Sequence, residues 1–391
     1  MDINNFDLSN AEVIDQEINP LSYNPDDYPG IDEFVERVLN GNNRPVYTPD
    51  LKALSLNGRV VADKMDRYLA APYNSSSALK EIHKNPAAYY FYVNDKSNFE
   101  ETESKSFELG TFCHSAFLEP DKFDKVIVEP NYPRNSWDGV NKLVAFWEGT
   151  IWNKYTYKGV AEKKLQKALL MVTEKGLDVK KLDGAKCYID CLQEVSEYTA
   201  ISEKHKLIIE LIKRYYYSYG GGIIPAILRG AQFETSFYTE DPNTGLKVKV
   251  RPDAFNIEEN IGFNTIISFK TTSAPDMGKF LYDSAKYKYE LSEGMYQEVT
   301  SHVTGRKFNV TIMIVLQTVP PYLPAVFFWA PEDLENGKYK YRYALDTIRE
   351  CVDKGLYPGF EALAESGHYG IIQMHQPEWA TKLLHPVDLE D

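Results

Sequence analysis

The fold is decided by residues 251–272, which read RPDAFNIEENIGFNTIISFKTT. Two runs of apolar and β-branched residues in this stretch predict two neighbouring strands. Asp253 stands between strand residues in the first run, and Lys270 follows the apolar pair Ile266-Ile267 in the second. A lysine on a largely buried strand needs a charged partner, so we expect Lys270 to lie opposite Asp253.

A carboxylate and a lysine on adjacent strands suit the hydrolysis of a phosphodiester assisted by a divalent cation. Carboxylates hold such a cation, and the lysine lies near the attacking water. Taken singly, Asp253 could be a turn aspartate and Lys270 a surface residue. A cation better explains an acid that is flanked by strand residues and opposed by a lysine.

Outward from this stretch, the residue pattern alternates between strands and helices and predicts an α/β fold. The expected strands cover residues 233–238, 246–254, 265–270, 309–318 and 325–330. The expected helices cover residues 277–304 and 333–354, with two short helices around Pro86 and an apolar helix that contains His114 and ends at Glu119-Pro120. The first three strands should form a meander that feeds one edge of a sheet.

Composition divides the chain into regions. Residues 1–70 are expected to form an acidic N-terminal arm with one short helix near residues 34–39. Residues 131–230 predict a mostly helical insertion, and residues 231–355 hold the expected sheet and its helices.

The charge and the cysteine content narrow the class of protein. A net charge of -14 excludes a basic nucleic-acid coat, so any contact with DNA must be local or made through metal ions. The chain shows no signal peptide and no long apolar run, so we expect a cytoplasmic protein without a membrane partner. Cys187 and Cys191 could begin a metal site, but ordinary helix cysteines explain their spacing better.

Several motifs, in the same order along the chain, resemble the RecE-type phage exonuclease domain (exodeoxyribonuclease VIII-like) of the PD-(D/E)xK nuclease superfamily. They are residues 74–80 (NSSSALK), 110–123 (GTFCHSAFLEPDKF), 251–253 (RPD) and 269–272 (FKTT). The resemblance spans roughly residues 70–350 and implies a restriction-endonuclease-like core, with a central mixed sheet flanked by helices. It also implies that the nuclease domain covers residues 71–391.

The resemblance implies a role for each matching residue. His114 would be a metal ligand from an N-terminal helix, although a histidine on an apolar helix is more often a core residue. Asp253 would bridge metal and phosphate, and Glu234 would reach the metal from the preceding strand, unless it is a solvated strand glutamate. Lys270 would orient the attacking water, and Tyr296 matches the tyrosine of the family's helix motif.

Two positions depart from the family pattern. Ser268 stands where the family has a second metal-binding acid, and Ser292 stands where it has a glutamine. A serine hydroxyl is at best a neutral metal ligand, so its presence weakens the attraction for a hard cation. Glu293 shares a helical face with Tyr289 and Tyr296 and could fill the place of the missing acid, or it could face the solvent.

Other residues suggest how DNA is held. Lys247, Lys249 and Arg251 alternate along one strand and are expected to line one face beside Asp253, where they could follow a DNA backbone. We expect a few of the 28 tyrosines to stack on bases of a frayed end and most to be core or interface residues. The expected cofactor is Mg²⁺ or Mn²⁺.

Two functions of different classes follow. The first is a metal-dependent exonuclease that hydrolyses double-stranded DNA from its ends in phage-type recombination. By resemblance it would form a homo-oligomer, work with a single-strand annealing protein and act in the cytoplasm of a bacterial or phage-infected cell. The second is a catalytically impaired pseudonuclease that binds DNA ends or proteins as a decoy, scaffold or inhibitor. Ser268 could also have been introduced to silence an active enzyme.

Overall fold

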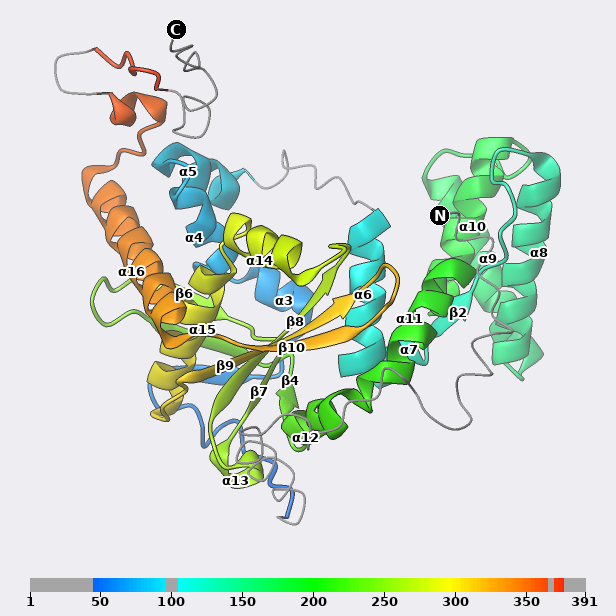
Figure 1. Cartoon of the computed structure of the whole chain (residues 1–391). Helices are drawn as coiled ribbons and strands as arrows, with labels where there is room; N and C mark the ends of the chain where they lie inside the picture. The colour runs from blue at the N-terminus through cyan, green and yellow to red at the C-terminus, as the bar shows by residue number, and fades with distance from the viewer. Residues whose placement is uncertain (1–44, 96–104, 365–368, 376–391) are drawn as a thin grey trace, which may run out of the picture.

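A five-stranded mixed sheet forms the centre of the fold in the computed structural model, which describes residues 45–95, 105–364 and 369–375 (Figure 1). Its order is β10-β9-β8-β7-β4. The strands are β4 (Gln232–Phe233), β7 (Ala254–Asn256), β8 (Thr265–Thr272), β9 (Val310–Gln317) and β10 (Pro324–Phe328). β8 runs parallel to β9, and the other pairs are antiparallel. This mixed α/β sheet is the one that the sequence predicted.

A second, three-stranded sheet adjoins the first and has the order β1-β5-β6. Its strands are β1 (Arg59–Val61), β5 (Ser236–Glu240) and β6 (Lys247–Val250). Residues 45–70, which were expected to belong to an arm, thus contribute a strand to this sheet, and the short helix expected near residues 34–39 lies outside the described residues.

The prediction of continuous strands over residues 233–238 and 246–254 was wrong. Each divides into two short strands that belong to different sheets. One crossing is at Glu234, whose φ of 50° interrupts the extended backbone, and the other is at residues 251–253. Pro252 has no amide hydrogen for a strand ladder, which favours a break there. The two segments, around Glu234 and at residues 251–253, therefore pass from one sheet to the other side by side.

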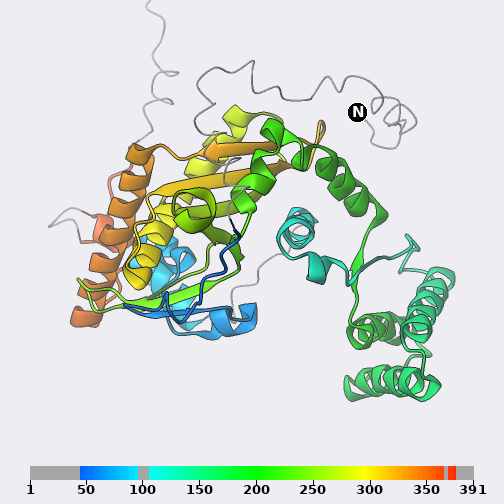
Figure 2. The ribbon, with the colours of Figure 1, turned by 90° about the horizontal axis from the view of Figure 1, so that it is seen from below.

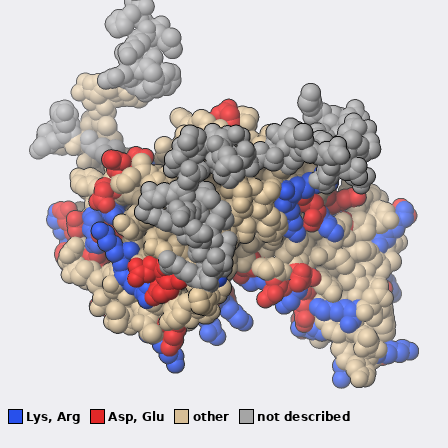
Figure 3. Space-filling model, turned by 60° about the horizontal axis from the view of Figure 1, so that its bottom comes forward, with Lys and Arg blue, Asp and Glu red and all other residues tan. Residues whose placement is uncertain are grey.

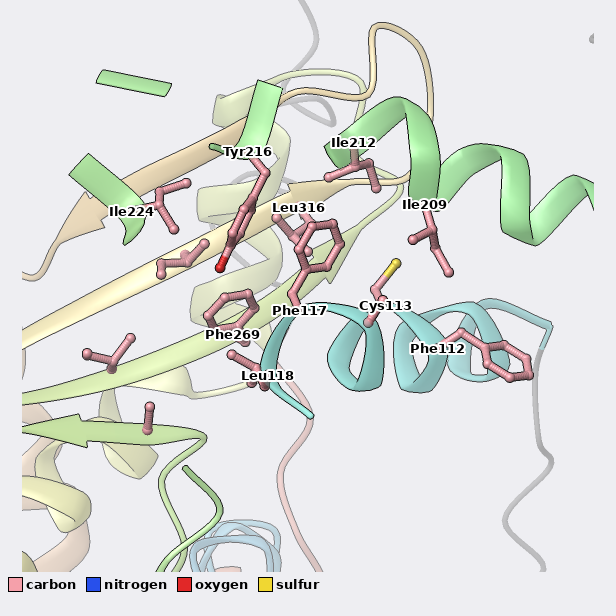
Figure 4. Close-up of a cluster of buried hydrophobic side chains, with 14 of the residues drawn as sticks. Phe112, Cys113, Phe117, Leu118, Ile209, Ile212, Tyr216, Ile224, Phe269 and Leu316 are labelled. Atoms are coloured by element: carbon pink, nitrogen blue, oxygen red, sulfur yellow. The ribbon is translucent and has the colours of Figure 1, made fainter. Parts of the chain in front are cut away.

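Helices cover both faces of the central sheet. One side holds α4 (Ser76–Ile82), α15 (Tyr289–Thr304) and α16 (Pro331–Lys354), and the other holds α6 (Lys105–Leu118), α11 (Glu203–Tyr216) and α12 (Ile223–Leu228). Successive residues of β8 point to opposite faces. Ile266 packs in the core on the α15 side, whereas Ile267 and Phe269 pack in the core beneath α6 and α11 (Figure 4).

The remaining helices are short or lie at the edges of the sheets. They are α3 (Met65–Ala70), α5 (Pro86–Asn94), α7 (Pro120–Phe123), α13 (Glu258–Ile261) and α14 (Met277–Lys286), with 3₁₀ turns at Tyr219–Gly221 and Phe360–Leu363. The two short helices expected around Pro86 are confirmed as α4 and α5. The prediction of a single helix over residues 277–304 was wrong, because Lys288 adopts a left-handed conformation that separates α14 from α15.

Of the helical insertion expected over residues 131–230, α11 and α12 pack against the central sheet, and only the earlier part forms its own bundle to one side of the sheets (Figures 1 and 2). It contains α8 (Trp137–Lys154), α9 (Lys158–Glu174) and α10 (Leu182–Ser196), beside a parallel pair of strands, β2 (Val126–Val128) and β3 (Thr199–Ile201). The bundle has a separate apolar core around Trp147, in which Cys191 is buried and against which Cys187 packs. None of the helices in the described ranges combines the length and apolar character that a membrane span requires.

Two glycines allow α15 and α16 to cross with their backbones close together. A Cβ atom added to Gly337 would lie 2.0 Å from the carbonyl oxygen of Glu290, and one added to Gly294 would lie 2.7 Å from the amide nitrogen of Lys338. Any larger residue at this crossing must therefore push the two helices apart.

The substitution Gly337→Ala is expected to destabilise the protein by about 1–3 kcal/mol, the usual cost of overpacking a core. The free energy of unfolding in urea, compared with that of the unchanged protein, measures this loss. Gly149→Ala is the matched control, because a Cβ atom at that site in α8 meets nothing within 4 Å. That change should stabilise by about 0.5–1 kcal/mol. If Gly337→Ala and Gly149→Ala have the same free energy of unfolding, the close approach of α15 and α16 at Gly337 is contradicted.

Candidate functional site

Three side chains from separate segments converge at the crossing between the sheets. The Nε2 atom of His114 lies 3.1 Å from Oε1 of Glu234 and 3.3 Å from Oδ1 of Asp253. One ligand atom of each residue lies within 4.8 Å of the others. The sequence placed these residues on a helix and on two strand segments, and the fold brings them together.

The apolar face of α6 fixes the position of His114. Cys113 and Phe117 of α6 pack with Ile209 and Tyr216 of α11 in the buried cluster shown in Figure 4. His114 follows Cys113 by about 100° around the helix, so it points away from this cluster. Because its side chain reaches two carboxylates, His114 is not the core histidine that an apolar helix would suggest.

The break in the strands sets Glu234 beside Asp253. The amide nitrogen of Glu234 donates a hydrogen bond to the carbonyl oxygen of Asp253 over 3.1 Å. The left-handed φ of Glu234 is uncommon for a residue other than glycine, and such backbone strain clusters at functional sites. Nε of the buried Arg251 donates to Oε2 of Glu234 over 2.6 Å, so the other carboxylate oxygen of Glu234 faces His114.

Asp253 links the triad to Lys270. Its Oδ2 atom accepts hydrogen bonds from the amide nitrogen of Phe269 over 2.6 Å and from Nζ of Lys270 over 3.3 Å. Burial alone would raise the pKa of Asp253, but the charge of Lys270 and the hydrogen bonds from His114 and Phe269 hold this pKa well below its usual range. Asp253 is therefore an anion at neutral pH.

Glu293 occupies the space beside Ser268. The Oγ atom of Ser268 lies 2.8 Å from Oε1 and 2.7 Å from Oε2 of Glu293, and the hydroxyl donates to this carboxyl group. Glu293 is only 1% exposed, so the expectation of a solvent-facing glutamate is wrong. Burial raises the pKa of Glu293 to about 7, although Lys270 and Ser268 oppose the rise. Helix α15 thus places a buried carboxyl group next to the hydroxyl of Ser268.

Residues of α4 complete this side of the site. Burial, together with the charge of Lys270, lowers the pKa of Lys80 to about 8. The partly buried Tyr296 forms a side-chain hydrogen bond with Ser76, and desolvation raises the pKa of its phenol above the ordinary value. Lys80 was missed as a site residue. The signal for it was its place at the end of the motif of residues 74–80.

The expected basic face of β6 is largely covered. The ammonium group of Lys249 donates to carbonyl oxygens at the end of α3, including that of Ala71 over 2.7 Å. Lys249 is 4% exposed and Arg251 is 9% exposed, whereas Lys247 is exposed. Lys249 and Arg251 thus hold α3 and Glu234 in place, and this face is not a solvated basic stripe.

A cavity of about 1740 Å³ opens onto the triad. Its walls include His114, Asp253 and Lys270, together with tyrosines of α3, α5 and the α14–α15 junction. Pockets for small molecules usually measure about 300–1,000 Å³, so this cavity has room for part of a polymer. On the coloured part of the face in Figure 3, basic and acidic side chains are intermingled. This face therefore offers no broad basic surface to a polyanion, and any such ligand would have to be bound by a small group of cations.

The three donors fit a divalent cation. An imidazole nitrogen and two carboxylate oxygens suit Mn²⁺, and the carboxylates with added waters suit Mg²⁺. The hydrogen bonds that Asp253 receives and the pairing of Glu234 with Arg251 orient both carboxylates, as outer partners of metal ligands do. His114, Glu234 and Asp253 would hold the cation.

The affinity for Mn²⁺ is expected to rise with pH until about pH 9. Burial lowers the pKa of His114, but Asp253 and Glu234 outweigh this effect and raise the pKa to about 9. Below that pH the cation must displace a proton from the imidazole, so the apparent association constant should rise up to about tenfold per pH unit. Calorimetric titrations in buffers with different ionisation enthalpies measure the released proton. His114→Ala should bind more weakly without this release, and a pH-independent affinity of the unchanged protein would contradict the assignment.

The chain is similar to a protein family and to solved structures. Residues 75–365 match a family described as a PDDEXK-like domain of unknown function (DUF3799). A crystal structure described as a "Putative exonuclease" from Eubacterium rectale aligns with a TM-score of 0.41 and 13% identity, over 82% of this chain and 98% of that chain. The structure of SSO0001 aligns with a TM-score of 0.21 and 14% identity, over 53% and 93%. Both scores are too low to carry an argument, and no curated protein matches the chain.

Proposed function

Because this chain belongs to the family of PDDEXK-like domains designated DUF3799, we propose that it is a metal-dependent nuclease that hydrolyses double-stranded DNA from its ends. The observation that carries the proposal is the convergence of His114, Glu234 and Asp253 beside Lys270. A divalent cation held there, Mg²⁺ or Mn²⁺, would supply Lewis acidity at the scissile phosphate.

The residues of the chain have separate tasks in this proposal. The ammonium group of Lys270 lies against Asp253 and would orient the attacking water and stabilise charge that develops on the phosphate. Glu293 would supply the acid that Ser268 replaces, and Tyr296 would hold α15 against α4 through Ser76. Lys247, which is exposed near the cavity, would contact the DNA backbone.

The finer assignments of the proposal rest on the resemblance of the motifs to RecE-type exonucleases. They are a role in phage-type recombination, a homo-oligomeric assembly, a single-strand annealing partner and action in the cytoplasm of a bacterial or phage-infected cell. We assign the nuclease domain to residues 71–391, and the family match over residues 75–365 supports this division.

A second candidate function is a pseudonuclease that binds DNA ends or proteins without cutting. The observation in its favour is Ser268 at the position of a metal-binding acid. The burial of Glu293 against Ser268 favours the active enzyme, because burying a carboxyl group lowers the free energy of unfolding and a function of the group would explain why it is buried there.

Digestion of end-labelled linear duplex DNA with Mg²⁺ or Mn²⁺ tests the proposal, with the same DNA as a closed circle for comparison. We expect nucleotides to be released from linear DNA while the circle stays intact. Cutting of the circle would show an endonuclease. Binding of linear DNA without any cutting would favour the pseudonuclease.

A further inference from the structure

Two tyrosine rings lie together where the expected long helix is broken. The ring centroids of Tyr287 and Tyr289 are 6.0 Å apart, and the ring planes make an angle of 25°. Both residues line the cavity that contains His114, Asp253 and Lys270. Tyr287 is 53% exposed, so this ring of the pair offers surface to a ligand.

The break in the helix creates this arrangement. In a continuous helix, residues two apart point in directions about 200° different, so Tyr287 and Tyr289 would lie on opposite sides. Instead, Lys288 between them has φ 51° and ψ 52°, a left-handed conformation that is unfavourable for a residue other than glycine. Such strain persists where the surrounding structure imposes it, and it is common at ligand sites.

The pair extends from the catalytic lysine toward the solvent. Nζ of Lys270 lies 5.7 Å from the ring centroid of Tyr289, and Nζ of Lys80 lies 5.6 Å from the same centroid. The exposed Lys286 has its Nζ 5.7 Å from the ring centroid of Tyr287. An aromatic surface surrounded by ammonium groups has the two features that bind single-stranded nucleic acid, since bases stack on the rings and phosphates pair with the cations.

We propose that Tyr287 stacks on an unpaired nucleobase at the end of the DNA and so positions the neighbouring phosphate at Lys270. This inference rests on the proposed nuclease function and names the part of the substrate that the site grips. Every base has a π face, so the contact is indifferent to sequence. The enzyme would accordingly bind a frayed or single-stranded end more tightly than a paired one.

Equilibrium binding of a short labelled single strand, with Ca²⁺ in place of Mg²⁺, tests the contact without hydrolysis. Tyr287→Leu should weaken binding by about 5- to 150-fold, the range that one base–aromatic stack provides. Tyr287→Trp should retain the affinity. Tyr282→Leu is the matched control and should bind like the unchanged protein, because Tyr282 is 67% exposed on α14 and is absent from the described lining of the cavity.

A strand with an abasic site scanned along its length separates stacking from a structural role. At one position of the strand, removal of the base should weaken binding to the unchanged protein. At that position the unchanged protein and Tyr287→Leu should then bind with equal affinity. Unchanged affinity of Tyr287→Leu, or an equal loss at every abasic position, would overturn the stacking contact. If the unchanged protein binds no DNA, the proposed nuclease function fails as well. If it cuts DNA while Tyr287→Leu has normal affinity, only the stacking contact fails.

Discussion

Replacing Lys270 with methionine is expected to lower the rate of DNA hydrolysis by about 10²- to 10⁴-fold, the usual contribution of one positioned proton-transfer or charge-stabilising group. Methionine retains most of the length of the buried stem and removes only the ammonium group. That group donates a hydrogen bond to Asp253 over 3.3 Å and lines the cavity beside the triad. Initial rates on end-labelled duplex DNA measure the effect.

The control for this variant is Lys142→Met on α8, whose exposed lysine pairs with Asp138 in the helical bundle, away from the cavity. It should cleave DNA at the normal rate. Thermal unfolding of both variants shows whether any loss of activity comes from loss of structure. Full activity of Lys270→Met would show that Lys270 has no catalytic role. If the unchanged protein is itself inactive, the pseudonuclease is the better interpretation.

An aspartate at position 268 of strand β8 is expected to restore the activity of a variant that lacks the Glu293 carboxylate. Glu293→Ala should lower the rate by about 10- to 100-fold, the usual loss when support of a metal site is removed. The double variant Ser268→Asp with Glu293→Ala should recover most of this loss, because an aspartate at position 268 would place a carboxylate in the space that Glu293 now fills.

The single variant Ser268→Asp is the informative companion. Its new carboxylate would lie against that of Glu293 in a buried site, and two such acids do not both ionise. We therefore expect it to gain no activity and to lose stability. If Ser268→Asp alone cuts DNA and the unchanged protein does not, Glu293 has not taken over the role of the missing acid.

The sequence predicted the centre of the fold because local pattern and tertiary structure agree there. Strand β8 and helix α6 each carry apolar residues at the period of their own structure, so a buried strand through Ile266-Ile267 and an apolar helix through His114 could be predicted. The order of the motifs then brought His114 and Asp253 into one site. The expected contact between Lys270 and Asp253 is present as a hydrogen bond, and the pairing of β7 with β8 brings the two segments together.

The features that the sequence did not predict depend on contacts between distant segments. Pro252 is a local signal for one strand break, but nothing local shows the break at Glu234, which follows from the passage of the chain between two sheets. Lys249 looked solvated, since its alternation with valines cannot show that α3 covers it. The left-handed Lys288 lies in a stretch with good helix propensity, so only the packing of α14 and α15 explains it.

The close crossing of α15 and α16 has a consequence for how the protein could be regulated and how it could evolve. Glu293 immediately precedes Gly294, one of the two glycines at that crossing, so the position of the acid depends on where a neighbouring helix rests. A carboxylate on β8 would be held by a backbone ladder and would be insensitive to α16. If Glu293 serves the cation site, as we propose, occupancy of that site and packing of α16 become thermodynamically linked, and a substitution far from the cation can change its affinity.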